Sequence, residues 1–404
     1  MISERAWAEI DLGALRNNIS QIRNRIPAAC DVMLVIKADA YGHGMKIVAS
    51  AAQQFGIQAF GVRDSREALE LREIAVRQRI LVLGTVIESE VEKCLEQGIE
   101  LAIHATDRVR SLRQLVKRLG HRLHSKPRVH LNVDTGMGRL GLPVESAPKV
   151  LDAILAAENE LELVGIMTHL ARPEGGAHEF TIEQCARFQQ FLNVARTKNV
   201  KFATRPGEPG ARIHIANSAA VFAGLNQNPI LAGGQMVRPG IAAYGVMPRD
   251  VAGADSLQPV MSLRAQIAFL KDVSKGTSIS YGQEWIAPAK TRIATVPIGY
   301  YDGIPWRVKG KGVALVRGQR ARIVGRITMD YVMLDITKIP NVHVGDTVTF
   351  FGKDGDAYLP VEEIAKSIET IPYEITCLVG TRVKRIAMDT RIEPKITEQP
   401  LASV

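Results

Sequence analysis

Apolar runs of strand length alternate with stretches of helical periodicity from residue 13 to about residue 240. Eight such runs can be counted, at residues 32–36, 59–62, 80–84, 101–105, 129–133, 163–169, 212–217 and 235–240. Near-continuous apolar strands with helices between them favour parallel pairing with both faces covered. Because eight strand–helix units close a TIM-type (β/α)8 barrel, we expect an α/β barrel over residues 1–250.

The periodicity changes after about residue 250. Short alternating strands punctuated by glycine follow, among them "TRIATV", "GVALVRG" and "YVMLDI", with one short helix predicted at "VEEIAKSI". This pattern predicts a separate, mostly β domain over residues 251–391. Residues 392–404 lack an apolar period, so we expect a loose tail.

The composition is that of an ordinary globular protein, with 46% hydrophobic and 23% charged residues. The opening "MISERAWAEI" carries charges where a signal peptide has its apolar core, and no run of 18 apolar residues occurs. We therefore expect a cytoplasmic protein that does not enter the membrane. The four cysteines form no CxxC pair, which favours reduced thiols and argues against a bound metal.

The net charge of +9 raises the question of nucleic-acid binding. Part of the charge lies in "RVRSLRQLVKRLGHRLHSK", where Leu112, Leu115 and Leu119 fall at helical spacing. The basic residues therefore occupy the solvated face of an amphipathic helix. Because neither interleaved aromatic residues nor a nucleic-acid motif accompanies them, we expect no nucleic-acid partner. A basic balance equally suits the attraction of small anions.

Polar residues gather where the predicted barrel strands end. They are Lys37, Arg139, His169, Asn217, Ser218 and Arg238. In barrels the active site lies at the carboxyl ends of the strands, so these side chains should converge. A lysine among apolar walls suits Schiff-base chemistry, because burial and nearby cations lower its pKa. The glycine-containing "RPGI" and the "ANSA" segment suit a phosphate at the last two strand ends. A lysine beside a phosphate cradle suggests pyridoxal 5′-phosphate.

Ten ordered segments, spread over nearly the whole chain, resemble the alanine racemase family, the fold-type III enzymes that depend on pyridoxal phosphate. They are "AWAEIDL", "VIKADAYGHG", "VDTGMGRLG", "GIMTHLA", "ANSAA", "VRPGIAAYG", "SYGQEW", "PIGYYDG", "GRITMD" and "IPYEITCLVGTRV". The resemblance implies an isomerase that interconverts L-alanine and D-alanine and supplies D-alanine for peptidoglycan.

The resemblance also implies which residues act on the substrate. Lys37 would bind the cofactor covalently and serve as the base on one face of the substrate carbon. A racemase needs a second acid–base group on the opposite face. Tyr281 matches that second base, which the family takes from the partner subunit of a homodimer. A tyrosine would require cationic neighbours to act as a base at neutral pH.

The remaining roles concern the cofactor and the substrate carboxylate. Arg238 matches the arginine that faces the pyridine nitrogen; because arginine keeps its proton, it argues against a decarboxylase, whose related barrel places a carboxylate there. His169 would stack on the cofactor ring, with Asn217 and His214 as supports. Arg139 would bind the cofactor's phenolic oxygen and lie near the substrate carboxylate, which Met329 of the other subunit would also contact. The phosphate-binding set would be Tyr41, Ser218, Gly240, Ile241 and Tyr373.

The sequence departs from the family at two positions. Many members carry a lysine, modified to a carbamate, seven residues before the arginine, and here that position is Asn132. We hypothesise that the Asn132 amide, together with an anion such as chloride, orients Arg139 instead. Tyr301 replaces a commoner alanine beside Tyr300, a residue that narrows the entrance in the family. It either alters substrate access or points into the β domain.

Two other functions compete with the leading one. A broad-spectrum racemase, or one acting on serine or lysine, is kept open by Asn132, because one methylene is worth only about 1–3 kcal/mol of favourable contact. A non-catalytic module that only holds pyridoxal phosphate is disfavoured, because such barrels lack a second domain carrying a residue like Tyr281.

Overall fold

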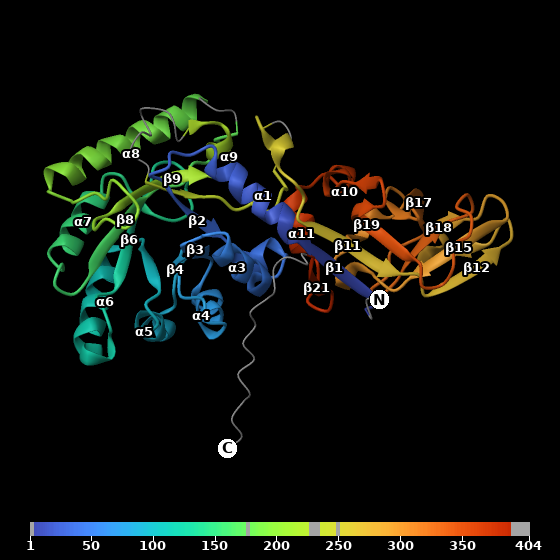
Figure 1. Ribbon diagram of the computed structural model, residues 1–404, viewed down its shortest axis with the longest axis horizontal. Helices are drawn as coiled ribbons and strands as arrows, with labels where there is room; N and C mark the ends of the chain where they lie inside the picture. The colour runs from blue at the N-terminus through green and yellow to red at the C-terminus, as the bar shows by residue number, and fades with distance from the viewer. Residues whose placement is uncertain (1–3, 175–177, 226–234, 248–250, 389–404) are drawn as a thin grey trace, which may run out of the picture.

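The computed structural model describes residues 4–174, 178–225, 235–247 and 251–388. These residues form a barrel and a mostly β domain that lie side by side (Figure 1). The predicted tail at 392–404 and the predicted domain boundary at residue 250 both lie outside the described residues.

Eight parallel strands of the described chain form a closed barrel, because each pairs with the next and β5 pairs with β6 to complete the ring. Every predicted apolar run overlaps one of them, and the predicted α/β barrel followed by a mostly β domain is confirmed. The barrel strands are β2 Asp31–Val35, β3 Ala59–Val62, β4 Arg79–Val82, β5 Glu100–Ile103, β6 Arg128–Asp134, β8 Glu162–Met167, β9 Arg212–Asn217 and β10 Met236–Arg238. The two-residue β7, Leu142–Pro143, pairs with β6 outside the ring.

Helices cover the outside of the barrel (Figure 1). Asp11 caps the first of them by accepting the Ala14 N–H at 2.9 Å, and Asp64 caps α4 in the same way. The basic helix α6 buries Leu112, Leu115 and Leu119, as its periodicity predicts. The helices of this part are α1 Leu12–Arg23, α3 Met45–Gln54, α4 Ser65–Glu73, α5 Glu88–Glu96, α6 Thr106–Leu119, α7 Ala147–Leu155, α8 Glu179–Thr197 and α9 Ser218–Phe222; α2, Lys37–Tyr41, is a special turn described below.

The second domain is built on one large sheet. Its strands are β1 Ala6–Asp11, β11 Met261–Gln266, β12 Phe269–Val273, β15 Thr291–Val296, β16 Val313–Val316, β17 Gln319–Val324, β18 Val332–Asp335, β19 Thr347–Asp354, β20 Ala357–Leu359 and β21 Lys384–Met388. A separate hairpin joins β13 Ser278–Ile279 to β14 Trp285–Ile286. The predicted helix at "VEEIAKSI" is α10, Val361–Ser367, and the sequence pattern missed a second one, α11, Pro372–Cys377.

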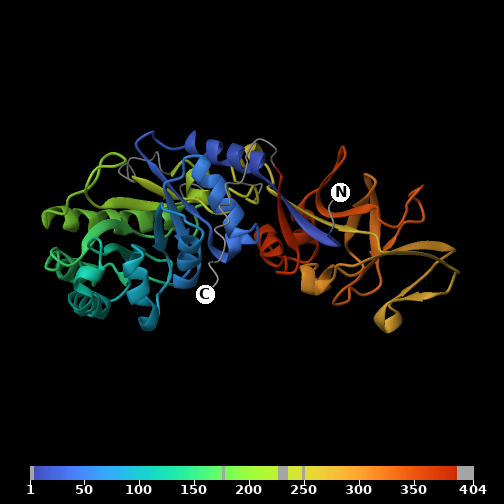
Figure 2. The ribbon, with the colours of Figure 1, turned by 60° about the horizontal axis from the view of Figure 1, so that its bottom comes forward.

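Several contacts join the domains, and two of them are made by β1 and by α11. The first strand, β1, pairs with β11 and β21 of the large sheet, although it precedes the barrel in sequence (Figures 1 and 2). The helix α11 packs against the turn that follows Lys37, so closely that a Cβ on Gly42 would lie 2.0 Å from the Thr376 carbonyl oxygen. Glycine is required at this approach, and through it the second domain brings Tyr373 to the mouth of the barrel.

Candidate active site

A cavity of about 320 Å³ opens at the carboxyl ends of the barrel strands. Lys37 follows the end of β2, and Asn217 and Arg238 are the last residues of β9 and β10. All ten residues predicted from the sequence to hold the cofactor line this cavity: Lys37, Tyr41, Arg139, His169, Asn217, Ser218, Arg238, Gly240, Ile241 and Tyr373. The expected convergence at the strand ends therefore occurs in the fold.

The chain leaves Lys37 through a left-handed turn. Residues 38–41 all have φ between 52° and 55°, a conformation that costs an L-residue roughly 1–2 kcal/mol. Polar contacts hold the turn: Glu67 accepts the first N–H at 2.7 Å, and the Asp39 carboxylate accepts the first N–H of α3 at 2.6 Å. The buried His43 lies with its Nδ1 2.9 Å and 3.0 Å from two carbonyl oxygens of the turn. Strained backbone of this kind is typical of functional sites.

The Lys37 amine is tuned by its surroundings. Burial lowers its pKa, and the Arg139 guanidinium lowers it further, while Glu67 acts in the opposite direction. A lysine with a lowered pKa is neutral in a larger fraction of molecules at neutral pH, and the neutral amine is the nucleophilic form. The sequence prediction of an activated lysine is consistent with this environment.

The loop after β6 presents Arg139 to the cavity. The Asp134 carboxylate accepts backbone N–H groups of residues 136–138 at 2.8 to 3.2 Å, which fixes the loop. Asn132 donates its amide to the Leu140 carbonyl at 3.3 Å and lies 3.2 Å from His104 Nδ1. Asn132 therefore fastens the backbone next to Arg139. Among the hydrogen bonds of the described residues, it makes none to the guanidinium itself.

Arg238 is a buried cation, 5% exposed. Its Nη1 lies 2.9 Å from His214 Nδ1 and its Nη2 donates to the Thr168 carbonyl at 2.6 Å. Burial lowers the pKa of Arg238 to about 10, so the guanidinium keeps its charge at neutral pH. Burial and Arg238 lower the pKa of His169 to about 3, so that imidazole is neutral.

A cradle of small polar groups lies beside the last two strands. Ser218 Oγ accepts the backbone N–H groups of Gly240 at 2.9 Å and Ala242 at 3.2 Å. Gly240 has no room for a side chain, because a Cβ would lie 2.5 Å from Tyr41 Oη. The Tyr41 ring packs 5.2 Å from the buried Tyr244 ring. Convergent hydroxyl and backbone N–H groups of this kind suit an anionic phosphate.

The predicted second base lies elsewhere in the chain. Tyr281, Tyr300, Trp306, Met329 and Tyr331 line an open cavity of about 860 Å³ on the β domain, which we call the aromatic face. The Tyr281 side chain is 72% exposed. Within one chain, Lys37 and Tyr281 thus line different cavities.

The Tyr281 side chain is presented by a tight turn. Ser280 has a φ of 67°, and its hydroxyl donates to the Arg326 carbonyl at 2.7 Å. Gly282 also has a positive φ, and a Cβ there would lie 2.7 Å from Arg326 Cζ.

Tyr301, the residue after Tyr300, lies under Arg382, with the guanidinium carbon 4.6 Å from the ring centroid. Tyr301 lines neither of these two cavities.

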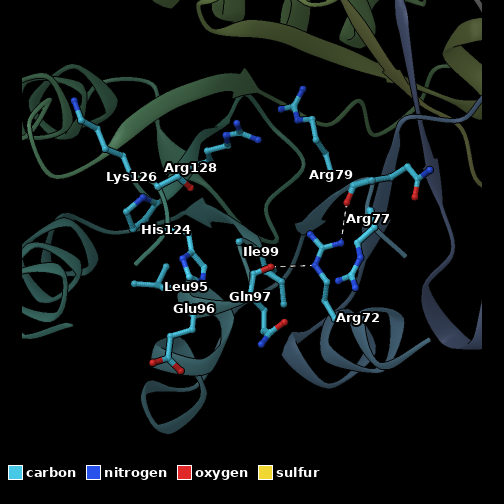
Figure 3. Close-up of a pocket in the computed structure, with 14 residues that line it drawn as sticks. Arg72, Arg77, Arg79, Leu95, Glu96, Gln97, Ile99, His124, Lys126 and Arg128 are labelled. Atoms are coloured by element: carbon cyan, nitrogen blue, oxygen red, sulfur yellow. Dashed lines mark hydrogen bonds between the residues drawn. The ribbon is translucent and has the colours of Figure 1, made fainter. Parts of the chain in front are cut away.

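A larger cavity, of about 460 Å³, lies at the opposite end of the barrel. Arg79 and Arg128, the first residues of β4 and β6, line it together with Arg72 and Arg77 (Figure 3). Barrel active sites lie at the carboxyl ends of the strands. The Lys37 cavity is therefore the candidate active site, although it is smaller.

Comparison with known proteins assigns the family. The model of the alanine racemase N-terminal domain matches residues 10–248, and that of the C-terminal domain matches residues 260–387. The chain belongs to the alanine racemase family. It is therefore an enzyme of the isomerase class, and the resemblance stated from the sequence is confirmed.

Individual alanine racemases match this chain over almost their whole length. The alanine racemase of Citrifermentans bemidjiense is 40% identical over 395 residues, which cover 96% of this chain and 99% of that protein. Among solved structures, alanine racemase from Clostridium difficile 630 matches with a TM-score of 0.87 at 32% identity, over 96% of this chain and 97% of that one. Alanine racemase from Bartonella henselae, solved with covalently bound pyridoxal phosphate, matches with a TM-score of 0.80 at 28% identity, over 95% and 100%.

Membership of the alanine racemase family does not by itself assign roles to single residues, so those roles stay predictions. Residues missed by the sequence reasoning also shape the site: Glu67 accepts the Ala38 N–H, and Met137 and Glu174 line the Lys37 cavity. Tyr244 lies in the quoted "VRPGIAAYG" block, four residues after Gly240, and its hydroxyl donates to the Val35 carbonyl at 3.0 Å. No helix within the described ranges has both the length and the apolar character needed to cross a bilayer.

Proposed function

We propose that this enzyme interconverts L-alanine and D-alanine with pyridoxal 5′-phosphate, in the cytoplasm, and supplies D-alanine for peptidoglycan. The observation that carries the proposal is the convergence on one cavity of Lys37, a charged Arg238 and a cradle of hydroxyl and backbone N–H groups. The names of the relatives support alanine as the substrate.

The residues of the cavity fit this cofactor. Lys37 would hold it covalently, as the Bartonella henselae relative holds it. The hydroxyls of Ser218, Tyr41 and Tyr373 and the backbone of Gly240 and Ile241 would hold its phosphate. The absence of a side chain at Gly240, where a Cβ would fill the space before Tyr41 Oη, supports this placement.

The other cofactor contacts would come from three strand ends and a loop. Arg238 would face the pyridine nitrogen, His169 would lie on the ring with Asn217 in support, and Arg139 would bind the phenolic oxygen. The bound cofactor supplies an electron-withdrawing ring that stabilises negative charge on the substrate α-carbon. Because Arg238 keeps its proton, it offers only donors and weakens that electron withdrawal. Return of the proton to carbon is thereby favoured over decarboxylation.

The proton is exchanged by two groups on opposite faces of the α-carbon. Lys37 Nζ, with its lowered pKa, serves one face. Tyr281 Oη of a partner subunit serves the other face, and Met329 and Arg139 hold the substrate carboxylate. Support comes from the aromatic face, where Tyr281 and Met329 lie together, exposed, and away from the Lys37 cavity of their own chain. A homodimer with shared sites would bring the two cavities together.

The function is tested by racemisation assays on the purified enzyme loaded with pyridoxal phosphate. L-alanine, L-serine, L-lysine and L-arginine are offered separately, and the D-isomer of each is followed. Strong preference for alanine is expected. Comparable turnover of the larger amino acids would assign a broad-spectrum racemase instead, and no turnover of any of the four would contradict the proposal. Repeating the alanine assay with and without chloride tests the anion proposed beside Asn132.

A further inference from the structure

A row of hydrogen-bonded side chains starts at Arg238 in the Lys37 cavity and crosses the inside of the barrel. His214 Nδ1 lies 2.9 Å from Arg238 Nη1, and His214 Nε2 lies 2.9 Å from His130 Nδ1. His130 Nε2 then lies 2.8 Å from Glu100 Oε2. We call these four residues the buried relay. Its members come from β10, β9, β6 and β5, so it links the carboxyl end of one strand to the amino end of another.

The residues around the buried relay leave space for its side chains inside the barrel. Both imidazoles are fully buried, and Glu100 is 0% exposed. On β8 the residue beside them is Gly165, where a Cβ would lie 2.1 Å from His130 Nδ1 and 2.8 Å from His214 Nε2. Any larger residue there would displace the histidines. Glycine at position 165 of β8 therefore leaves the space that the two imidazole rings occupy.

The two ends of the relay determine where every proton lies. Arginine can only donate, so His214 Nδ1 must accept and its proton must lie on Nε2. His214 then donates to His130 Nδ1, and His130 donates from Nε2 to the Glu100 carboxylate, which can only accept. Burial lowers the pKa of both histidines, so each is neutral and carries a single proton. Only this pair of tautomers satisfies all three hydrogen bonds.

The charges at the two ends are opposite. Among the described residues, Arg238 makes no ion pair with a carboxylate, and its contacts are imidazoles and carbonyl oxygens. Burial raises the pKa of Glu100, but the hydrogen bonds from His130 and Arg79 and the charge of Arg79 outweigh burial and lower the pKa below its usual range. Glu100 is therefore negative at neutral pH. Arg79 lines the cavity at the amino ends of the strands (Figure 3). Its guanidinium donates two hydrogen bonds to the Glu100 carboxylate, at 2.7 Å and 3.0 Å.

We propose that Glu100 is a positioning residue for the racemase reaction, which acts on Arg238 through His130 and His214. Its carboxylate fixes the tautomers of both imidazoles, and these present a lone pair that holds the Arg238 guanidinium in place. The proposal rests on the proposed function in one respect, namely that Arg238 faces the cofactor nitrogen. The relay explains why a glutamate, which usually lies at the surface, is buried at the start of β5.

The central variant is Glu100→Gln, which keeps the size and an accepting oxygen but removes the charge. The matched control is Glu162→Gln, at the same end of the barrel, where Glu162 is paired with Arg128 at 3.4 Å. Arg128 also lies 3.8 Å from Glu100, so this control removes a charge from the same ion-pair group without touching the hydrogen-bonded relay. We expect Glu100→Gln to lower kcat for alanine on the order of tenfold, as loss of a supporting partner commonly does, with KM changed less than about twofold. Glu162→Gln should leave both unchanged.

A double variant distinguishes a positioning role of Glu100 in the reaction from a purely structural role in stability. Glu100→Gln together with Arg79→Gln removes the cation that Glu100→Gln alone would leave unpaired, while Arg128 keeps its other partner, Glu162. The double variant should therefore recover the thermal midpoint that Glu100→Gln loses. The proposal expects kcat to stay low in this double variant. Recovery of kcat in step with the thermal midpoint would overturn it.

The direct readout is the protonation of the imidazole nitrogens. Nitrogen NMR on histidine-labelled enzyme, assigned with His130→Gln and His214→Gln proteins, should show a proton on Nε2 and none on Nδ1 for both residues. In Glu100→Gln a second tautomer should appear. Unchanged tautomers and unchanged kcat in that variant would refute the positioning role even if the enzyme racemises alanine. If the wild-type enzyme racemises nothing while the tautomers are as assigned, the proposed function fails and the buried relay stands.

Discussion

The Lys37 cavity and the aromatic face differ in how complete each is within one chain. The Lys37 cavity gathers residues from β2, β6, β8, β9, β10 and α11. The side chains of Asn132, Asn217, Ser218 and Arg238 in it are already held by hydrogen bonds within the chain. The aromatic face gathers Tyr281, Tyr300 and Met329 from loops of the β domain, and all three side chains are exposed. The fold of a single chain is enough to form the Lys37 cavity and to lower the pKa of Lys37 within it. An exposed tyrosine can act as a catalytic base only if another surface covers it.

The largest effect should follow removal of the lysine. Lys37→Ala should lower alanine racemisation by roughly 10⁴-fold, the upper end of what one acid–base group contributes, because the covalent attachment is lost as well. Racemisation rate and circular dichroism are measured together, since the fold should be intact. Residual activity above about a tenth of wild type would show that the Lys37 cavity is not the reaction centre.

Removal of one hydroxyl from the aromatic face should have the next largest effect. Tyr281→Phe keeps the ring and should lower racemisation by about 10²- to 10³-fold, because only one face of the α-carbon is then served. In heavy water this variant should still exchange the α-proton of one alanine enantiomer but not of the other. Tyr301→Phe is the matched control and should stay within about twofold of wild type, because Tyr301 lies under Arg382 and lines neither cavity. Equal loss in both variants would contradict a specific role for Tyr281.

A smaller effect tests the phosphate cradle. Gly240→Ala introduces a Cβ 2.5 Å from Tyr41 Oη, and the tyrosine must move to accommodate it. We expect affinity for pyridoxal phosphate to fall about tenfold, which corresponds to about 1.4 kcal/mol, as measured by titration of the cofactor-free protein. Tyr41→Phe combined with Gly240→Ala removes the 2.5 Å contact and leaves the ring Cζ 3.0 Å from the added Cβ, so its affinity should return part of the way toward that of Tyr41→Phe alone. Unaltered affinity in Gly240→Ala would place the phosphate elsewhere.

The smallest expected effect is a shift in the pH profile of pyridoxal phosphate uptake. The rate at which cofactor-free protein takes up pyridoxal phosphate should depend on the neutral fraction of the Lys37 amine. Arg139→Leu removes a cation that lowers the pKa of Lys37, so that pKa rises and the uptake profile should move to higher pH. Glu67→Gln removes a group that raises the same pKa, so its profile should move to lower pH. Movement of both profiles in one direction would refute the electrostatic account of Lys37.

Much of the barrel could be predicted because buried parallel strands read as near-continuous apolar runs, and a helical period separates each from the next. The placement of β1 could not, because its alternating pattern fits either domain and its partners, β11 and β21, lie more than 250 residues away along the chain. The helix α11 was missed because "PYEITC" is too short to show a period.

The site was predictable where residue type and position agreed, as for Lys37 and Arg238 at strand ends. The left-handed turn at residues 38–41 was not, because alanine and tyrosine rarely adopt positive φ and the single aspartate among them is only a weak signal for it. The buried relay was not predictable either. A glutamate and two histidines on three strands become neighbours only once the barrel has closed, and Gly165 leaves the space between them.

One complete site should need the Lys37 cavity of one chain and the aromatic face of another. Lys37→Ala and Tyr281→Phe subunits, each nearly inactive, are mixed, allowed to exchange, and assayed for alanine racemisation, with exchange verified by mass. Random pairing in a twofold dimer gives half of the dimers one intact site, so roughly a quarter of the wild-type activity should return. No recovery in mixtures that have demonstrably exchanged subunits would contradict the shared site.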